Sequence, residues 1–424
     1  MRRIMSFALC AVLMVASCCA PQNEKVQVLT GIDVLEANGF QQLQGKRVGL
    51  VTNPTGVNKD LVSTVDVLFN AEGVELVALY GPEHGVRGDV HAGDLVSGNS
   101  DPKTGLPVHS LYGKTVKPTP EMLEGLDAII YDIQDIGCRS FTYISTMGKV
   151  MEAAADLDLE VIVLDRPNPL GGEKIEGPIV EEGFFSFVSQ FEIPYVYGLT
   201  CGELALLLNE EGLIKDKEGN VKKCKLTVVP MEGWTRDMLF EDTNLPWVLP
   251  SPHIPQPVSA FFYPATGIVG DLGCYSIGVG YTLPFQMIAV EGVDADKVSE
   301  RLNGLDLPGV KFRPINVKPF YAVGKGTDMQ GVQIYITDVK RAALTDIQFH
   351  VMEVIADMYP EKAAFKVASD KRYRSFDIVT GSDYFRKTFS ENHKFSDIKE
   401  RWYEDVDSFR ELSKKYYLYN YILG

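Results

Sequence analysis

The sequence predicts an α/β fold, with a Rossmann-like domain built on a mainly parallel sheet and a smaller α+β auxiliary domain after it. Short runs rich in Val, Ile and Leu alternate with helical stretches between about residues 26 and 215. Such runs are typical of strands that are buried on both faces. The stretch 245–264 is rich in proline, and it marks a boundary because proline fixes the backbone and removes a hydrogen-bond donor.

The elements of the first domain follow from these runs in chain order. Strands are predicted at 47–52, 75–80, 127–131 and 160–164, and helical segments between them at 61–71, 120–126 and 145–157. The next helix is expected at 200–211, because Thr200 and Glu203 have the spacing of a capping box and Gly212 is a common helix end. A further strand is predicted at 226–229.

The second part of the chain mixes strands and helices. A strand is predicted at 332–337 and a helix at 345–359, which Pro360 ends. One last long helix is expected because apolar residues recur at steps of three and four. They are Ile398, Trp402, Val406, Phe409, Leu412 and Tyr416. We therefore predict a leader at 1–17, a catalytic domain at 26–252 and an auxiliary domain at 253–424.

The composition limits the partners of the protein. The chain has 424 residues, with 57 acidic and 41 basic side chains and a formal net charge of −16. This length and ordinary globular composition indicate about two domains. A negative surface repels polyphosphate, so nucleic acid is not expected as a partner.

The N-terminus has the pattern of an export signal. Arg2 and Arg3 precede an uncharged run at 4–16, which is too short to span a bilayer as a helix. The following residues, 15–18, resemble a bacterial lipobox that ends at Cys18. We expect Cys18 to be acylated and to hold the protein at the bacterial cell envelope, facing the periplasm or the cell surface. Membrane contact is expected through this lipid anchor only.

Polar segments follow each of the first four strands, at 52–56, 81–89, 132–139 and 165–172. The carboxyl ends of strands in an open parallel sheet meet at one crevice, where ligands bind. We expect this crevice to collect the polar side chains of these segments: Asn53, Glu83, His84, Arg87, Asp132, Asp135, Arg139, Asp165, Arg166 and Asn168.

Three other kinds of site do not fit the sequence well. The first loop lacks GxGxxG, and no GxxxxGK[ST] occurs, so no nucleotide cofactor is expected. No GxSxG elbow surrounds Ser140 or Ser145, which argues against a serine hydrolase. Glu83, His84, Asp89, His91 and Asp94 lie close in sequence but match no known ligand spacing. No metal is predicted, although a metal-assisted hydrolase stays an alternative.

Paired carboxylates with arginines indicate glycoside hydrolysis, which needs a protonated acid and a second group that stabilises or attacks the oxocarbenium ion. Glu83 is the predicted acid, because neighbouring Gly and Pro residues fix it at a tight strand end. Asp132 or Asp135 is the predicted second carboxylate, and Tyr143 is placed to hydrogen-bond either one. The arginines suit recognition of a substrate carboxylate.

A purely structural role is an alternative interpretation of the same charged residues. Asp132 and Asp165 are also expected partners for Arg139 and Arg166, and they are equally suited to capping loops. In that case these carboxylates hold the strand ends together and do not act on a substrate.

Several ordered motifs then carry a resemblance. They include GPEHGVRGD at 81–89, DPKTGLPV at 101–108, DIQDIG at 132–137, FTYIST at 141–146 and DRPNPLGG at 165–172. The chain resembles the NamZ-like (YbbC-like) exo-β-N-acetylmuramidases. The resemblance implies removal of terminal N-acetylmuramic acid from peptidoglycan fragments during cell wall recycling. It also implies that Glu83 is catalytic and that the arginines bind the lactyl carboxylate of this sugar.

The segment 270–286 departs from the family pattern. Where relatives carry Glu and Arg residues, Asp271 is the single formal charge between 253 and 290. The resemblance therefore implies a divergent member with an altered substrate contact. A non-catalytic lipoprotein that binds a cell-wall saccharide is the alternative function.

Overall fold

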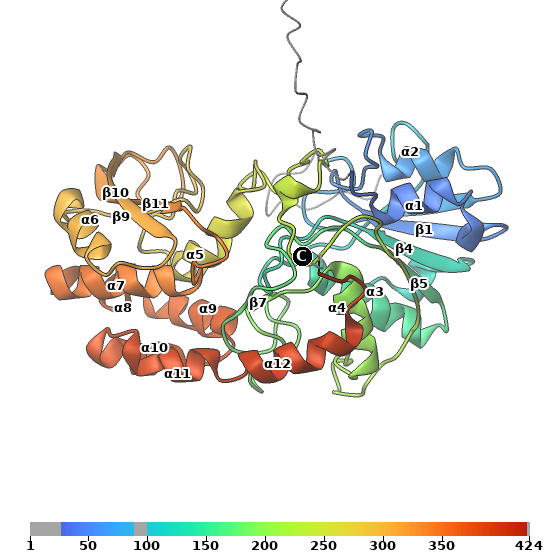
Figure 1. Cartoon of the computed structure of the whole chain (residues 1–424). Coiled ribbons are helices and arrows are strands. Elements are labelled where there is room, and N and C mark those ends of the chain that lie inside the picture. Colours follow the sequence, from blue (N-terminus) through green and yellow to red (C-terminus); the bar gives the residue numbers. More distant parts are fainter. Residues whose placement is uncertain (1–26, 89–99, 422–424) are drawn as a thin grey trace, which may run out of the picture.

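The computed structural model describes residues 27–88 and 100–421. Figure 1 shows two lobes side by side, with a parallel sheet in one and a small antiparallel sheet in the other. The C-terminal helices run along one side of both lobes. Within the described ranges, no helix combines the length and the apolar character needed to cross a membrane.

The first lobe is built on a six-stranded sheet in the order β3-β2-β1-β4-β5-β8, and every pairing in it is parallel. Its strands are β1 (Arg47–Thr52), β2 (Glu75–Gly81), β3 (Val108–Ser110), β4 (Ala128–Asp132), β5 (Glu160–Leu164) and β8 (Lys225–Val229). The predicted fold class is confirmed. The chain runs outward from β1 to β3 and then continues on the other side from β4, so the switch point lies between β1 and β4.

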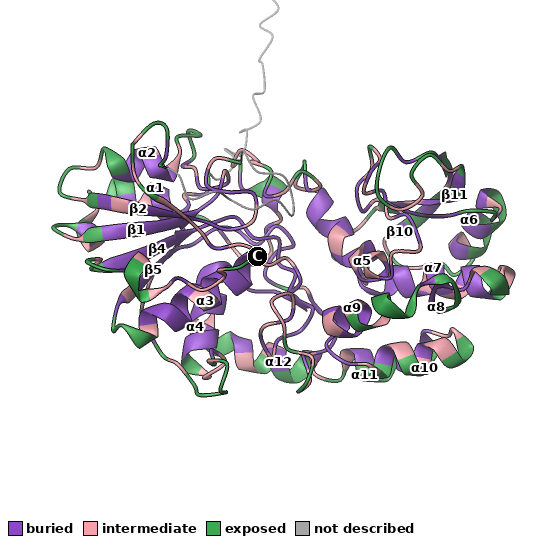
Figure 2. Cartoon of the chain, turned by 180° about the vertical axis from the view of Figure 1, so that it is seen from behind, coloured by how far each residue is buried: buried purple, intermediate pink, exposed green. Residues whose placement is uncertain are grey.

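Helices cover both faces of this sheet. They are α1 (Gly31–Ala37), α2 (Thr64–Phe69), α3 (Tyr143–Asp156) and α4 (Cys201–Glu210). Alternate strand residues enter two separate cores: Ile130 packs in one, and Ile129 and Tyr131 pack in the other. Figure 2 shows these central strands as buried. The capping box of Thr200 and Glu203 is present at α4.

Short elements connect the main ones. They are η1 (Gln41–Leu43), η2 (Pro120–Met122), β6 (Ile175–Glu176), β7 (Val196–Tyr197), η3 (Phe240–Asp242) and η4 (Pro360–Lys362). The helix predicted at 120–126 is only the single turn η2, because the segment holds little more than one turn before Gly125, whose φ is +74°. Residues 243–258, which contain the predicted boundary, form no helix or strand.

The second lobe has an antiparallel sheet in the order β10-β11-β9. Its strands are β9 (Met287–Val290), β10 (Val310–Val317) and β11 (Met329–Ile336), and its first helices are α5 (Ser259–Asp271), α6 (Ala295–Asn303) and α7 (Asp346–Met358). The short α8 (Ala364–Val367) follows, and then α9 (Asp370–Thr380) and α10 (Tyr384–Asn392). Figure 1 shows α5 on the side of this lobe that faces the first lobe.

The predicted last long helix is wrong in one respect, because it is broken into α11 (Ser396–Tyr403), α12 (Val406–Ser413) and η5 (Lys414–Tyr416). Its apolar residues serve two cores. Ile398 and Trp402 pack in the second lobe, whereas Val406 and Phe409 pack in the first. The break lets the chain return to the first lobe, where Tyr419 packs edge-on against Trp234 at a centroid distance of 5.0 Å.

Candidate active site

An ion pair occupies the switch point of the parallel sheet. Arg166 Nε and Nη2 donate to the two carboxylate oxygens of Asp132 at 2.6 and 2.8 Å, and Thr64 Oγ1 donates to Asp132 at 2.5 Å. Arg166 Nη2 also donates to the Val57 carbonyl at 2.8 Å. The Asp132 side chain is fully buried. In this structure Asp132 is held in a bidentate pair, while Arg166 also lines a small hollow with Thr55, Asn58 and Gln134. The catalytic role of Asp132 and the substrate contact of Arg166 stay predictions.

Arg139 binds the backbone of both lobes. Its side chain is fully buried, and its guanidinium donates to three carbonyls: Pro178 and Ile193 at 2.6 Å, and Val379 at 2.9 Å. Its Nε has no hydrogen-bond partner. Burial lowers the pKa of Arg139 to about 10. Val379 lies in α9, so this cation joins the two lobes, and the role of Arg139 in substrate binding stays a prediction.

Asp165 and Asn168 also bind only other parts of the protein. Asp165 accepts from Thr200 Oγ1 at 2.7 Å and from Tyr419 Oη at 2.5 Å, and burial raises its pKa to about 6. Asn168 accepts from the Leu170 amide and donates to the Leu199 carbonyl, both at 2.9 Å. Both side chains are buried. These hydrogen bonds fix the loop after β5, and the contacts of Asp165 and Asn168 with substrate stay predictions.

Arg87 is paired as well. Its guanidinium binds both oxygens of Asp101 at 2.9 and 3.1 Å and reaches Asp66 at 3.2 Å. The Arg87 hydrogen bond is the main reason why the pKa of Asp101 lies well below its usual range. This half-buried network fixes the loop that follows β2. The contact of Arg87 with substrate stays a prediction, as it does for Arg139 and Arg166.

Glu83 lies on the tight turn after β2, half-buried. The amide of Gly85 donates to the Pro82 carbonyl at 3.0 Å, and both His84 and Gly85 have a φ of +74°. A side chain at Gly81 would come within 3.1 Å of the Val86 amide nitrogen, which explains the glycine there. The sequence therefore specifies the turn that presents Glu83.

Three tyrosines from the two lobes lie within the electrostatic range of Glu83. Tyr112 follows β3, Tyr143 begins α3, and Tyr263 lies in α5. Burial, and then the negative charge of Glu83, raise the pKa of Tyr112 to about 12. Burial also raises the pKa of Tyr143 and of Tyr263 well above the usual value, and Glu83 adds to both shifts. The negative charge of Glu83 thus contributes to the raised pKa of all three phenols.

Each of the two deeper phenols is held in place by a hydrogen bond. Tyr143 donates to the Pro250 carbonyl, and Tyr263 lies 3.2 Å from Ser140 Oγ. Asp135 is buried and accepts from the Tyr197 hydroxyl and from the Gly137 amide, the latter at 2.7 Å. Tyr143 therefore does not donate to either predicted carboxylate, which corrects its predicted hydrogen bond.

Two buried polar side chains at this site keep atoms without a partner. Asn53 Oδ1 binds Thr55, but Asn53 Nδ2 has no hydrogen-bond partner. His84 Nδ1 is also unpartnered, although the side chain is only 7% exposed. Buried polar groups are normally satisfied, so Asn53, His84 and Arg139, whose Nε is also buried and unpartnered, are predicted binding residues with a polar atom left for a ligand. Asp135 Oδ1 is unpartnered too, and burial raises the Asp135 pKa to about 7.

Sequence reasoning missed Tyr112, Tyr263 and His253. Tyr112 follows the three-residue strand β3, which is too short to produce a clear pattern. Tyr263 belongs to the second lobe, and its approach to Glu83 depends on the packing of α5. His253 is close enough to His84 for their charges to interact. The prolines around residue 250 were the sequence feature that could have pointed to this part of the site, because they shape the segment that Tyr143 binds.

In the described parts of the chain, no group of three or more His, Cys, Asp and Glu side chains is arranged to hold a metal ion. Asp89, His91 and Asp94 of the alternative metal cluster lie outside the described residues, and so does Cys18.

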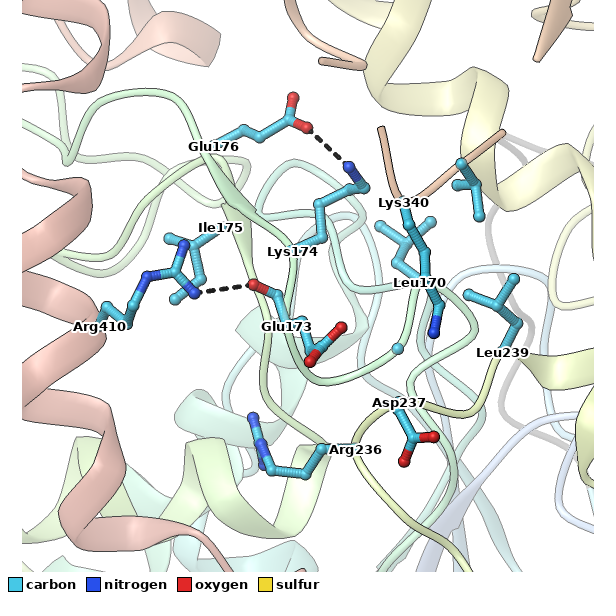
Figure 3. Close-up of a pocket in the computed structure, with 12 residues that line it drawn as sticks. Leu170, Glu173, Lys174, Ile175, Glu176, Arg236, Asp237, Leu239, Lys340 and Arg410 are labelled. Atoms are coloured by element: carbon cyan, nitrogen blue, oxygen red, sulfur yellow. Dashed lines mark hydrogen bonds and ion pairs between the residues drawn. The ribbon is translucent and has the colours of Figure 1, made fainter. Parts of the chain in front are cut away.

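A separate hollow of about 200 Å³ lies between the lobes and contains none of the predicted site residues. Figure 3 shows its charged lining, in which Lys174 pairs with Glu176 at 3.2 Å and Arg410 donates to the Glu173 carbonyl at 2.9 Å. Arg236, at its base, is bound to Glu203 at 2.6 Å. These three cations are committed to neighbouring groups, so the hollow is less suited to chemistry than the Glu83 site.

The sequence matches two family descriptions, "Exo-beta-N-acetylmuramidase NamZ, N-terminal" over residues 48–258 and "C-terminal" over 261–419. It is 44% identical over 396 residues to the peptidoglycan β-N-acetylmuramidase NamZ of Bacillus subtilis (strain 168), covering 93% of this chain and 92% of that protein. A solved DUF1343 family protein of Bacteroides fragilis NCTC 9343 is 58% identical with a TM-score of 0.89, covering 93% of this chain and 100% of that one. A second from the same organism is 28% identical with a TM-score of 0.70, covering 93% and 99%.

Proposed function

The chain belongs to the NamZ family of exo-β-N-acetylmuramidases, and we propose that it releases terminal N-acetylmuramic acid from peptidoglycan fragments with Glu83 as the general acid. The observation that carries the proposal is the position of Glu83 among three phenols from both lobes. A terminal sugar bound there meets one half-buried carboxyl group next to unpartnered polar atoms. This arrangement suits an exo-acting glycoside hydrolase.

Glu83 protonates the glycosidic oxygen as the bond to the leaving sugar breaks. Positive charge then develops on the ring of the muramic acid. A water molecule adds to its anomeric carbon and gives a proton to the Glu83 carboxylate, which restores the acid. Asp132 is paired with Arg166, so we assign the stabilisation of this charge to Asp135, whose Oδ1 has no hydrogen-bond partner. Asp135 acts in its ionised form, so this contribution requires a pH near or above its raised pKa of about 7. Tyr143 lies within the electrostatic reach of both carboxylates and orients the sugar between them.

The lactyl carboxylate needs a donor other than the three predicted arginines, since Arg87, Arg139 and Arg166 are bound elsewhere. We propose that Asn53 Nδ2 and His84 Nδ1 bind the polar substituents of the muramic acid. Both atoms are buried and unpartnered without substrate, and a ligand that satisfies them removes an energetic cost of about 1–3 kcal/mol for each atom.

The test is release of free N-acetylmuramic acid from its β-1,4-linked disaccharide with N-acetylglucosamine. Glu83→Gln is expected to lower kcat by about 10²–10⁴-fold, the usual contribution of general acid–base catalysis. Glu300→Gln, at an exposed position in α6, is the matched control and is expected to behave as the parent.

The alternatives predict different results in the same assay. Equal rates for Glu83→Gln and the parent would overturn the catalytic assignment. Binding of the disaccharide without turnover by the parent would support a saccharide-binding protein. Loss of turnover with a chelator would support a metal-assisted hydrolase.

We also propose that the protein is lipid-anchored through Cys18 at the bacterial cell envelope. The support is the lipobox-like sequence before Cys18. Full-length protein should incorporate labelled palmitate and sediment with membranes, whereas Cys18→Ser should do neither. Equal labelling of the two proteins would reject the anchor.

A further inference from the structure

Three aromatic side chains of the second lobe form an exposed surface, here called the aromatic shelf: Tyr281, Phe320 and Tyr321. Phe320 is 66% exposed and Tyr321 is 51% exposed. The rings of Tyr281 and Phe320 are stacked, with centroids 5.7 Å apart and planes 27° apart. Large aromatic side chains gain little from such exposure alone, so the shelf has the character of a binding surface.

The backbone holds the shelf in place. The amide of Phe320 donates to the Gly280 carbonyl at 2.7 Å, which ties the β10–β11 connection to the segment after α5. Gly280 has a φ of +90°, and a side chain there would lie 2.0 Å from the Tyr321 carbonyl oxygen. The close approach of the two loops therefore requires glycine. A rigid platform loses little conformational entropy when a ligand binds.

A chain of contacts leads from the shelf to the catalytic turn. Tyr321 Oη and His253 Nε2 are 2.7 Å apart. Burial and the charge of His84 both lower the pKa of His253. His253 lies three residues after Pro250, whose carbonyl accepts a hydrogen bond from Tyr143, so the shelf adjoins the loop 250–253 that contacts the site.

The exposure of the shelf and the charge around it indicate which kind of ligand it binds. An exo-acting enzyme encloses the terminal sugar, here among buried side chains such as Asn53 and Tyr143. The rest of the saccharide must leave through the exposed side. The segment that carries Tyr281 has Asp271 as its single formal charge between 253 and 290. On the connection that carries Phe320 and Tyr321, Lys318 and Asp328 pair with each other at 3.0 Å, which leaves Lys325 as the other charge near the shelf. This largely balanced surface suits a neutral sugar.

We propose that the aromatic shelf binds the neutral N-acetylhexosamine on the leaving side of the scissile bond, with the sugar ring stacked on Phe320 and Tyr321. The inference rests on the proposed function and adds the leaving-group subsite.

The experiment compares two substrates: the muramic acid–glucosamine disaccharide and the methyl β-glycoside of N-acetylmuramic acid, which lacks a leaving sugar. Phe320→Ala and Tyr321→Ala are expected to lower the ratio of kcat/KM for the disaccharide to kcat/KM for the methyl glycoside about tenfold. Tyr321→Phe keeps the ring and should keep most of the ratio. Tyr335→Ala, an exposed tyrosine of β11, is the matched control and should leave the ratio unchanged.

A binding measurement separates this inference from the proposed function. In the Glu83→Gln background, Phe320→Ala should weaken binding of the disaccharide about tenfold and leave the affinity for free N-acetylmuramic acid unchanged. Failure of the parent to hydrolyse either glycoside would overturn the proposed function, while the binding result still tests the shelf. An unchanged disaccharide affinity, or an equal loss with both ligands, would overturn the subsite.

Discussion

Arg139→Met tests whether the charged loops of this sheet edge bind substrate or hold the fold. The change removes a fully buried guanidinium and leaves the carbonyls of Pro178, Ile193 and Val379 without their donors. Each unsatisfied carbonyl costs about 1–3 kcal/mol. No carboxylate among the described residues pairs with Arg139, so its removal also relieves a desolvation penalty of several kcal/mol.

The loss of the three hydrogen bonds should cost more free energy than the relief of the desolvation penalty returns. The net destabilisation is therefore expected to be about 2–4 kcal/mol. Thermal unfolding followed by circular dichroism should show a midpoint several degrees below that of the parent. The KM for the disaccharide, measured well below that midpoint, should stay within about twofold of the parent value.

The matched control is Arg313→Met, which makes the same substitution at an exposed arginine of β10. This variant should keep the thermal midpoint of the parent. The reasoning would be refuted if Arg139→Met kept its midpoint and raised KM about tenfold, because Arg139 would then contact the substrate and not the backbone of α9.

Three further variants test other parts of the structure. The pKa of Asp135 in the folded protein is raised to about 7, so ionisation of Asp135 destabilises the fold as the pH rises from about 4 to 7. The unfolding free energy of the parent relative to Asp135→Asn should therefore fall by a few kcal/mol across this pH range. Urea unfolding at several pH values measures this difference. Gly280→Ala should lower both stability and disaccharide affinity, whereas Gly219→Ala, also at positive φ with open space around it but in the turn 216–220 of the first lobe, should cost some stability and leave the affinity unchanged. Tyr419→Phe removes the hydrogen bond to Asp165 and should cost about 1–2 kcal/mol of unfolding free energy, with an unchanged urea midpoint counting against this contact.

The sequence predicts the parallel sheet well because its strands are buried on both faces. The run at 160–164 can only be a strand of this kind, and it matches β5 (Glu160–Leu164). The tight turn that carries Glu83 could also be predicted from the sequence, since the glycines around Glu83 mark such a turn. In both cases the signal lies within a few neighbouring residues.

The roles of the arginines could not be predicted in this way. Arg87, Arg139 and Arg166 look alike in sequence, each following a strand in a polar loop. Their partners are set by tertiary packing, and the Val379 carbonyl that Arg139 binds is 240 positions further along the chain. The sequence pattern gathers the charges at one edge, but it does not distinguish a charge that is paired from one that is free.

The second lobe contributes residues to the proposed active site. Tyr143 is held by Pro250, Tyr263 comes from α5, and Arg139 needs the Val379 carbonyl of α9. Tyr419, near the C-terminus, closes on Asp165 of the first lobe. A protein that ends before α5 would lose one of the three phenols around Glu83 and would expose unsatisfied groups at the sheet edge. The part of the chain predicted as auxiliary therefore helps to build the site, because the acid lies in one lobe and its surroundings come from both.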